Sequence, residues 1–224
     1  MPVIAVAGLK GGVGKSTIAV SLATELHTRG ASVLLADADP QRSILTWAAQ
    51  AAELELEHAA PTTVALHAGF HRPGQIPDGY EWTIVDTPPQ DGKGLRSALM
   101  VADVVLFPVQ PGPFDAWRLG DAAEQLEEAQ TVRPELAGAV VLNRMARTAL
   151  AAGAREALAE LGLPVLISTL GNRVAYAEAI AAGRGLTSYA PNSPAANEVR
   201  ALTNEVIALV TRRGRRRKGG KRGR

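Results

Sequence analysis

A glycine-rich segment near the N-terminus constrains the fold of this chain more than any other feature. It runs from Gly8 to Thr17 and reads GLKGGVGKST. The β-favouring run Val3–Ala7 precedes it, and a helix-like stretch from Lys15 to Arg29 follows it. Glycines in such a turn allow positive φ angles, so successive backbone N–H groups can face one side. The N-terminus of the helix adds positive partial charge. The segment therefore predicts a polyphosphate site.

Two side chains at the end of this segment complete the chemistry of a phosphate site. Lys15 can reach the β- and γ-phosphates of a nucleotide, and the Ser16 hydroxyl is a hard oxygen ligand suited to Mg²⁺. The segment departs from the general pattern G-x-x-x-x-G-K-[ST], because Leu9 replaces its first glycine and Gly8 lies one place early. A glycine-rich turn with an unrelated lysine is the alternative. The order strand, GKS, helix favours the phosphate site.

Carboxylates follow two further β-favouring runs. Asp37 and Asp39 come after the run Ser32–Ala36, and Asp86 ends the run that begins at Trp82. In open α/β sheets ligands bind at the carboxyl ends of the strands, where these residues are expected to gather. An aspartate at the end of an apolar strand commonly holds magnesium and its water. Asp37 has a second interpretation, as a cap of the helix that follows it.

Strand-like and helix-like segments alternate along the chain. The expected strands are short runs without polar alternation, typical of strands buried on both faces, and they cover Val3–Ala7, Ser32–Ala36, Trp82–Val85, Val104–Val109, Ala139–Leu142 and Val165–Ser168. The expected helices cover Lys15–Arg29, Ser43–Ala52, Asp115–Gln130, Ala149–Leu161, Val174–Ala181 and Pro194–Val210. Residues 53–80 stay unassigned. The pattern predicts an α/β fold: a single P-loop NTPase domain over residues 1–211, whose mostly parallel, twisted sheet carries helices on both faces.

The composition excludes several classes of site. The 224 residues include no cysteine, which rules out disulfides, thiolate zinc sites, iron–sulfur clusters and a cysteine nucleophile. The four histidines, at 27, 58, 67 and 71, show no metal-binding spacing, and the tryptophans at 47, 82 and 117 are flanked by apolar residues, as core residues are. No apolar run approaches the roughly 20 residues of a spanning helix. We therefore expect a cytoplasmic protein.

The C-terminal residues 212–224 differ in charge from the rest of the chain. They read RRGRRRKGGKRGR and hold nine of the 24 basic residues without one acid, so that the remainder is formally −7. We expect a flexible tail that contacts a polyanion, with a disordered solubilising end as the alternative. Only glycine separates the cations, which leaves no apolar side chain to insert into a membrane.

The glycine-rich segment also carries a second lysine, and the pattern K-G-G-x-G-K-[ST] resembles the deviant Walker A motif of the ParA/MinD family of ATPases. The segment Asp37–Gln41 is similar to that family's D-x-D-P-Q motif, and Asp86–Pro89 is similar to its D-x-P-P motif. The resemblance implies that Lys10 reaches across a nucleotide-sandwich dimer to the phosphates of the other subunit. It further implies that Asp39 positions the attacking water, while Asp37 helps to hold the magnesium shell.

More of the chain resembles the same family. The proline-rich segment Phe107–Asp115 looks like one that lies near the dimer interface. Val141–Arg144 is similar to the strand end that faces the adenine, and the loop Tyr189–Ser193 looks like the other wall of the base pocket. The resemblance assigns catalysis to Lys10, Lys15 and Asp39, and the metal to Ser16, Asp37 and Asp86. It assigns nucleotide binding to Lys10, Gly11, Gly12, Val13, Gly14, Lys15, Ser16, Thr17, Asn143, Arg144 and Pro191.

The resemblance is greatest to small plasmid-type ParA proteins without an N-terminal helix-turn-helix domain, and it implies a function. Such a protein is a slow, partner-stimulated ATPase that takes ATP and Mg²⁺, dimerises with ATP, binds DNA without sequence preference and associates with the nucleoid. With a ParB-like partner it segregates plasmid or chromosomal DNA; whether its dimers assemble further is left open. The expected DNA-contacting residues are Arg173, Arg200, Arg212, Arg213, Arg215, Arg216, Arg217 and Lys218.

Two other functions stay open on the same scaffold. One is a positioning ATPase for non-DNA cargo, such as a chemoreceptor cluster, a microcompartment or a conjugation complex. The other is an ATP-dependent metabolic enzyme, which would need a substrate pocket with additional polar residues.

Overall fold

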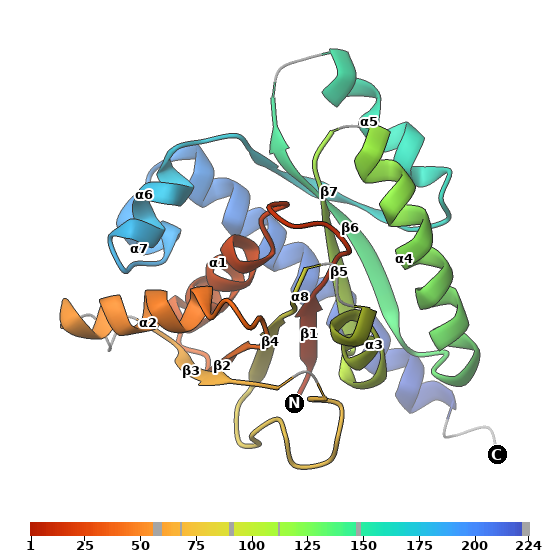
Figure 1. Ribbon diagram of the computed structural model, residues 1–224, viewed down its shortest axis with the longest axis horizontal. Coiled ribbons are helices and arrows are strands. Elements are labelled where there is room, and N and C mark those ends of the chain that lie inside the picture. The colour runs from red at the N-terminus through yellow and green to blue at the C-terminus, as the bar shows by residue number, and fades with distance from the viewer. Residues whose placement is uncertain (56–59, 68, 90–91, 112, 147–148, 221–224) are drawn as a thin grey trace.

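A parallel sheet of seven strands forms the centre of the protein (Figure 1). The computed structural model describes residues 1–55, 60–67, 69–89, 92–111, 113–146 and 149–220. Across the sheet the strands lie in the order β3-β2-β4-β1-β5-β6-β7, and every neighbouring pair is parallel. Their bounds are β1 Val3–Val6, β2 Val33–Asp37, β3 Thr62–Ala65, β4 Trp82–Asp86, β5 Val104–Val109, β6 Ala137–Met145 and β7 Val165–Gly171.

Helices cover both faces of this sheet and enclose two apolar cores. Their bounds are α1 Lys15–Thr28, α2 Ser43–Glu53, α3 Gly92–Val101, α4 Pro113–Val132, α5 Ala149–Ala159, α6 Ala175–Ala181, α7 Leu186–Tyr189 and α8 Pro194–Gly220. One core joins the sheet to α3, α4 and α5, through residues such as Leu95 and Leu126. The other joins it to α1, α2 and α8, through residues such as Ile18, Trp47 and Leu202.

The central strands are apolar on both sides because each side faces one of these cores. In β1, Ala5 belongs to the first core, whereas Ile4 and Val6 belong to the second. In β5 the alternation is the same, with Phe107 in the first core and Leu106 in the second. This explains why the sequence shows continuous β-branched runs in place of polar alternation.

The strand order reverses direction at β1, which places a crevice at the carboxyl edge of the sheet. From β1 the chain crosses to β2 on one side, and from β4 it passes over β1 to β5 on the other side. In open α/β sheets such a switch point is where ligands bind. The glycine-rich segment, Asp37 and Asp86 all lie at this edge.

The predicted α/β fold is confirmed, although several elements differ from expectation. Strand β3 lies in the unassigned region 53–80, and its residues are exposed or half-buried, so the signal of a buried strand is absent. Helices α3 and α7 were not expected. Trp47 and Trp82 pack on the core as predicted, whereas His58 and the Trp117 side chain lie outside the described part of the chain.

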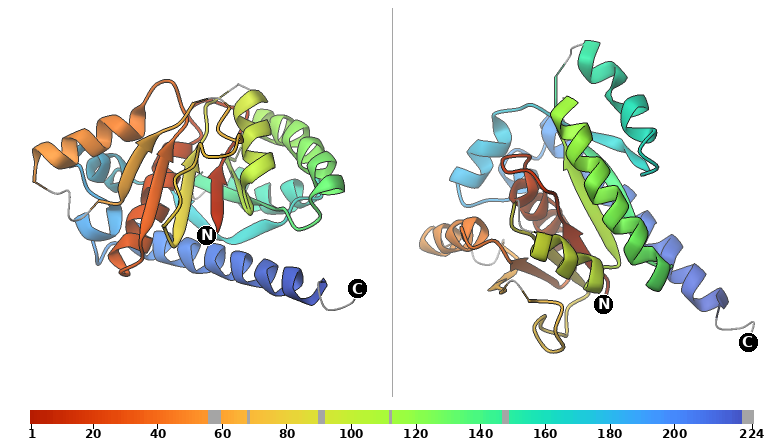
Figure 2. Two further views of the ribbon diagram at one scale, coloured as in Figure 1. Left: turned by 90° about the horizontal axis from the view of Figure 1, so that it is seen from below. Right: turned by 45° about the vertical axis from the view of Figure 1, so that its right-hand side comes forward.

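Helix α8 differs most from expectation, because it continues past Val210 to Gly220. Figure 2 shows it along one face of the sheet, with its last turns beyond the body of the protein. Val206 is buried in the core, and Val210 packs on it. The first residues of the expected tail are therefore helical backbone, while residues 221–224 lie outside the described part. The division of the chain at residue 211 stays a prediction.

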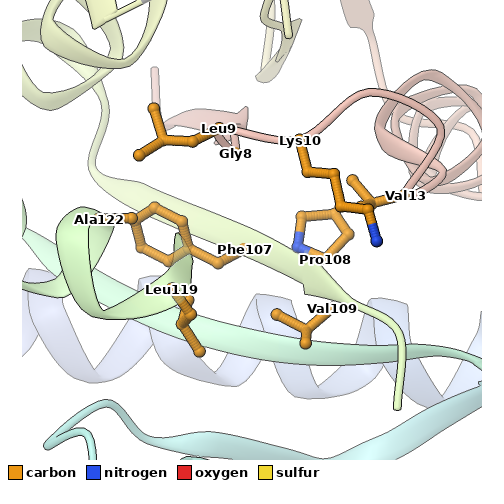
Figure 3. A pocket seen from close by; sticks show the side chains of 9 residues that line it. All are labelled: Gly8, Leu9, Lys10, Val13, Phe107, Pro108, Val109, Leu119 and Ala122. Carbon is orange, nitrogen blue, oxygen red and sulfur yellow. The ribbon is translucent and has the colours of Figure 1, made fainter. Parts of the chain in front are cut away.

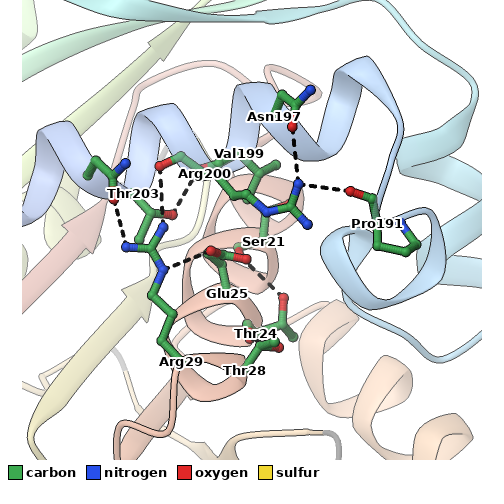
Figure 4. Close-up of polar contacts among 11 residues, drawn as sticks. Ser21, Thr24, Glu25, Thr28, Arg29, Pro191, Asn197, Val199, Arg200 and Thr203 are labelled. Carbon is green, nitrogen blue, oxygen red and sulfur yellow. Dashed lines mark hydrogen bonds and ion pairs between the residues drawn. The ribbon is translucent and has the colours of Figure 1, made fainter.

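Polar contacts fix α8 on α1 (Figure 4). The Arg29 guanidinium pairs with Glu25, with 2.8 Å between Nε and Oε1, and donates through Nη1 to Asn204 Oδ1 at 2.7 Å. Arg200 donates to the Pro191 carbonyl oxygen at 2.8 Å and to Asn197 Oδ1 at 3.1 Å. These contacts hold α8 against the C-terminal end of α1 and against the loop that precedes α8.

Candidate active site

The glycine-rich segment connects β1 to α1 with the backbone that a phosphate loop requires. Gly12 and Gly14 have φ angles of 75° and 93°, in the left-handed region that favours glycine. Gly14 directly precedes Lys15, the first residue of α1, and the first turn of that helix contains no acid. The positive end of the helix is therefore available to an anion.

Leu9, the departure from the general motif, has a packing role. Its side chain lies against the core that contains Phe107 and Leu119. Figure 3 shows Leu9 with these residues around a small cavity of about 20 Å³, which Lys10, Val13 and Pro108 also line. The leucine thus anchors the start of the loop. The role of Lys10 across a dimer stays a prediction.

Lys15 lies deep in the loop, and two carboxylates face it. Its side chain is 6% exposed, and Nζ donates to the backbone carbonyl oxygen of Lys10 at 3.2 Å. Burial lowers the pKa of the Lys15 ammonium, while the nearby carboxylates of Asp86 and Asp39 act to raise it. This is the position from which a single cation can meet the anionic end of a nucleotide.

Asp86 ends β4 directly beside the loop. Its Oδ2 accepts a hydrogen bond from Ser16 Oγ at 2.5 Å, whereas the fully buried Oδ1 has no partner among the described residues. Burial, opposed by the Ser16 hydrogen bond and reinforced by Asp37, raises the pKa of Asp86 to about 7. A divalent cation would stabilise the ionised form. The unpartnered carboxylate oxygen and the adjacent hydroxyl are the hard oxygen donors that suit Mg²⁺.

Asp37 caps helix α2, which is the second of the two roles that the sequence left open for it. Its Oδ2 accepts hydrogen bonds from the N–H groups of Ile44 and Leu45 in the first turn of α2, at 3.1 and 3.2 Å. Its Oδ1 accepts the Asp39 N–H at 3.0 Å. Burial raises the pKa of Asp37 although these hydrogen bonds oppose it. Its part in a magnesium shell stays a prediction.

Asp39 is 8% exposed and contributes to the field around Lys15. Its Oδ1 accepts the Gln41 N–H at 2.9 Å, which closes the turn before α2. The next residue, Arg42, has a φ of 56° and donates through Nη1 to the carbonyl oxygens of Asp37 and Leu66, at 2.9 and 3.1 Å. This turn holds Asp39 at the sheet edge.

Asn143 contacts the phosphate loop. Its Nδ2 donates to the Val13 carbonyl oxygen at 2.7 Å, and its Oδ1 accepts the Arg144 N–H at 2.9 Å. A Cβ atom on Gly14 would lie 2.2 Å from Nδ2, so only glycine fits beneath the amide. Gln110, which sequence reasoning missed, donates to the Gly12 carbonyl oxygen at 3.0 Å. Both amides hold the loop. The contact of Asn143 with the base stays a prediction.

A cleft of about 810 Å³ opens beside the loop. Gly14 and Thr17 border it on one side, and Asn143 and Arg144 on another. Residues that the sequence did not indicate also line it, among them Trp47 and Gln50 of α2, Gln110, and Gly171, Asn172, Val174 and Tyr176 around the start of α6. Pro191, predicted to border the base, does not line this cleft, and its carbonyl oxygen instead accepts a hydrogen bond from Arg200.

The residues predicted to contact DNA occupy different surroundings. Arg173 lines the cleft and pairs with Glu198 of α8, with 2.6 Å between Nη2 and Oε1. Arg200 is engaged with Pro191 and Asn197, and Arg212 is exposed on α8. The side chains of Arg213, Arg215, Arg216, Arg217 and Lys218 lie outside the described part of the chain.

No group of three or more His, Cys, Asp or Glu side chains among the described residues could hold a metal ion by itself. No described helix is both long enough and apolar enough to cross a bilayer.

Comparisons with known proteins agree with this geometry. The family model for the CobQ/CobB/MinD/ParA nucleotide binding domain matches residues 4–186. The maintenance of carboxysome distribution protein A of Halothiobacillus neapolitanus is 32% identical over 91% of this chain and 95% of that protein. The chromosome-partitioning ATPase Soj of Thermus thermophilus is 32% identical over 92% and 96%. The septum site-determining protein MinD of Pyrococcus horikoshii, complexed with Mg-ADP, superposes with a TM-score of 0.70 at 19% identity, over 95% of this chain and 98% of that one.

Proposed function

Because the chain belongs to the CobQ/CobB/MinD/ParA family of nucleotide-binding domains, and so is an ATPase that takes ATP with Mg²⁺, we propose that it positions a cargo in an ATP-driven cycle on DNA. The observation that carries the ATP-driven part of the proposal is the buried Lys15 between the phosphate loop and the carboxylates Asp86 and Asp39. We take the cargo to be plasmid or chromosomal DNA, segregated with a ParB-like partner. The relative named a chromosome-partitioning ATPase supports this choice.

Different residues of the site bind the phosphates, hold the metal ion and orient the attacking water during phosphoryl transfer. The N–H groups of the loop and the N-terminus of α1 bind the phosphates, and Lys15 offsets the charge that develops on the γ-phosphate. Ser16 and Asp86 would hold Mg²⁺, which supplies further positive charge against the phosphate oxygens. Asp39 orients the attacking water. Lys10 adds a second cation from the other subunit of an ATP-dependent dimer.

DNA contact in this proposal is made without sequence preference by the cationic end of α8, which places the protein on the nucleoid. The region from residue 212 onward concentrates nine cations, and α8 carries its first part beyond the body of the protein. Arg173 and Arg200 contribute less, because each is engaged with neighbouring protein groups. Phosphate contacts of this kind fix affinity but read no sequence.

A second candidate is the positioning of a non-DNA cargo by the same ATPase cycle. The relative named maintenance of carboxysome distribution protein A favours it, since that protein matches nearly the whole chain. The nucleotide site would be identical in both functions. The cargo-specific partner is then the component that differs.

ATP turnover of the full chain tests the proposal. We expect slow hydrolysis alone and an increase of about tenfold or more when non-specific DNA and the partner protein are both added. Asp39→Ala should bind ATP but not respond. A rate that rises instead with a small carboxylic acid, and ignores DNA, would indicate a metabolic enzyme and contradict the proposal. Co-purification of a DNA-binding partner or of a non-DNA assembly separates the two cargoes.

A further inference from the structure

The carboxylate of Glu198 on α8 receives four hydrogen bonds from one segment. Its Oε1 accepts from Nε and Nη2 of Arg173, at 3.0 and 2.6 Å. Its Oε2 accepts from the Gly171 N–H at 3.0 Å and from the Tyr176 hydroxyl at 3.2 Å. The Glu198 side chain is only 21% exposed. A single residue of α8 thus connects the end of β7, the loop after it and the start of α6.

All three of these partners border the cleft beside the phosphate loop. Gly171, Arg173 and Tyr176 form part of its lining, together with residues such as Trp47 and Gln50 of α2. Glu198 itself does not line the cleft. It therefore stands behind the wall, on the helix that leads to the cationic end of the chain.

We propose that Glu198 is a positioning residue that couples occupancy of the nucleotide cleft to the position and stability of α8. The inference rests on the proposed function in one respect, that the nucleotide binds in this cleft. A ligand that orders Arg173 and Tyr176 must also order the carboxylate to which both are bound. Because Glu198 is part of α8, a ligand that orders its carboxylate also restricts the motion of the helix.

Reciprocity gives this coupling a functional consequence. If ATP stabilises α8, then a partner that binds the stabilised helix binds more tightly when ATP is present, and that partner raises the affinity for ATP by the same factor. The charged pair with Arg173 and the hydrogen bonds to Gly171 and Tyr176 can transmit a factor of about ten between the two sites. DNA at the end of α8 and ATP in the cleft would then favour each other.

The chain contains a matched control for this role. Glu205 lies two turns further along α8 and also binds β7, by accepting the N–H groups of Ile167 and Ser168 at 2.8 and 2.9 Å. Neither of these residues lines the cleft. Glu205 therefore attaches the same helix to the same strand without a connection to the nucleotide.

Hydrogen–deuterium exchange of the full chain, with and without Mg-ATP, measures the coupling directly. In the wild type we expect Mg-ATP to slow exchange of α8 amides between residues 194 and 212 by about threefold or more. Glu198→Gln keeps an acceptor for the Gly171 N–H but loses the charge opposite Arg173, and it should remove most of this protection. Glu205→Gln should raise the basal exchange of α8 and keep the response to ATP.

Three outcomes would overturn the inference: full ATP-induced protection in Glu198→Gln, equal loss of protection in Glu205→Gln, or no response of wild-type α8 to bound ATP. An Arg173→Ala, Glu198→Gln double variant should show no further loss, because both residues act through one pair. Calorimetry of ATP binding distinguishes a failure of the coupling from a failure of the proposed function. ATP that binds without affecting α8 contradicts only the coupling, whereas ATP that does not bind contradicts the proposed function and the coupling that rests on it.

Discussion

Two aspartates that lie two positions apart have unlike surroundings in this protein. Both carboxylate oxygens of Asp37 accept hydrogen bonds from backbone N–H groups, and two of these N–H groups lie in the first turn of α2. Asp39 closes the turn with one oxygen and contributes to the field around Lys15. These contacts give Asp37 a structural role, whereas the chemical role of Asp39 stays a prediction.

Alanine substitution should separate these two roles. Asp39→Ala should bind ATP with little change and hydrolyse it about a hundredfold more slowly, because the water loses its orienting carboxylate. Asp37→Ala should lower the free energy of unfolding by about 1–2 kcal/mol, through the lost helix cap. Turnover and thermal unfolding of both variants test this. If Asp37→Ala is as stable as the wild type but traps ATP, the roles are reversed.

The close approach of Gly14 and Asn143 leads to a second prediction at this scale. Gly14→Ala places a side chain at a φ of 93° and a Cβ only 2.2 Å from the Asn143 amide nitrogen, so it should cost about 1–3 kcal/mol of stability and weaken nucleotide binding. Gly8→Ala is the control, since nothing lies within 4 Å of its Cβ position. Equal melting temperatures for the two variants would show that the loop is not clamped as described.

Much of the site is predictable because its parts are local in sequence. The loop from Gly8 to Thr17 and the aspartate that ends β4 can each be recognised from a few neighbouring residues and their place after a strand. Gln110 and Glu198 could not be found in this way. Their roles arise only when distant elements meet, and a surface glutamine or helical glutamate shows no pattern that marks such a contact.

The same reasoning explains the elements that the sequence did not indicate. The central strands are buried on both faces and show continuous apolar runs, so their positions were predicted well. Edge strand β3 is half exposed and lacks that run. Helix α3 packs tightly through Gly94, where a Cβ would lie 2.6 Å from Pro88, and a glycine inside a helix argues against predicting one.

The edge strand β7 is protected from pairing with another chain by side chains that bind its backbone. Arg155 donates to the carbonyl oxygens of Val165, Leu166 and Ile167, at 3.3, 2.6 and 3.0 Å. Glu205 accepts the N–H groups of Ile167 and Ser168. Ile167 is 85% exposed, so an uncapped edge here would present an apolar, unpaired strand.

This capping predicts a pH dependence of stability. Burial alone would raise the pKa of Glu205, but the hydrogen bonds from Ser168 and Ile167 outweigh it and hold the pKa below its ordinary value of 4.5. A lowered folded pKa adds stability above the ordinary value, and that stability is lost as the pH falls through the folded pKa. Glu205→Gln should therefore be less stable than the wild type at about pH 6, and the difference should shrink at about pH 3.5. An equal difference at both pH values in chemical denaturation would contradict the capping role.

Charge is distributed unevenly along the chain: residues 1–211 have a formal net charge of −7, and residues 212–224 hold nine cations and no acid. If about half of these cations contact phosphates, they contribute about −4 to the slope of log affinity against log salt. Removing residues 211–224 leaves the packed Val206 and Val210 in place. The truncated chain should bind DNA more weakly, with a flatter salt dependence and unchanged ATP affinity. Identical slopes for both chains would show that the folded surface alone contacts DNA.

The central claim is that Lys15, buried beneath the glycine loop and facing Asp86 and Asp39, holds the phosphates of ATP. Titration calorimetry with Mg-ATP tests it most directly, on the wild type, Lys15→Ala and the control Lys93→Ala, whose lysine lies on α3, outside the segment Gly8–Thr17. We predict that Lys15→Ala loses measurable binding while Lys93→Ala binds as the wild type does. Unchanged ATP affinity in a folded Lys15→Ala variant would contradict the assignment of the site.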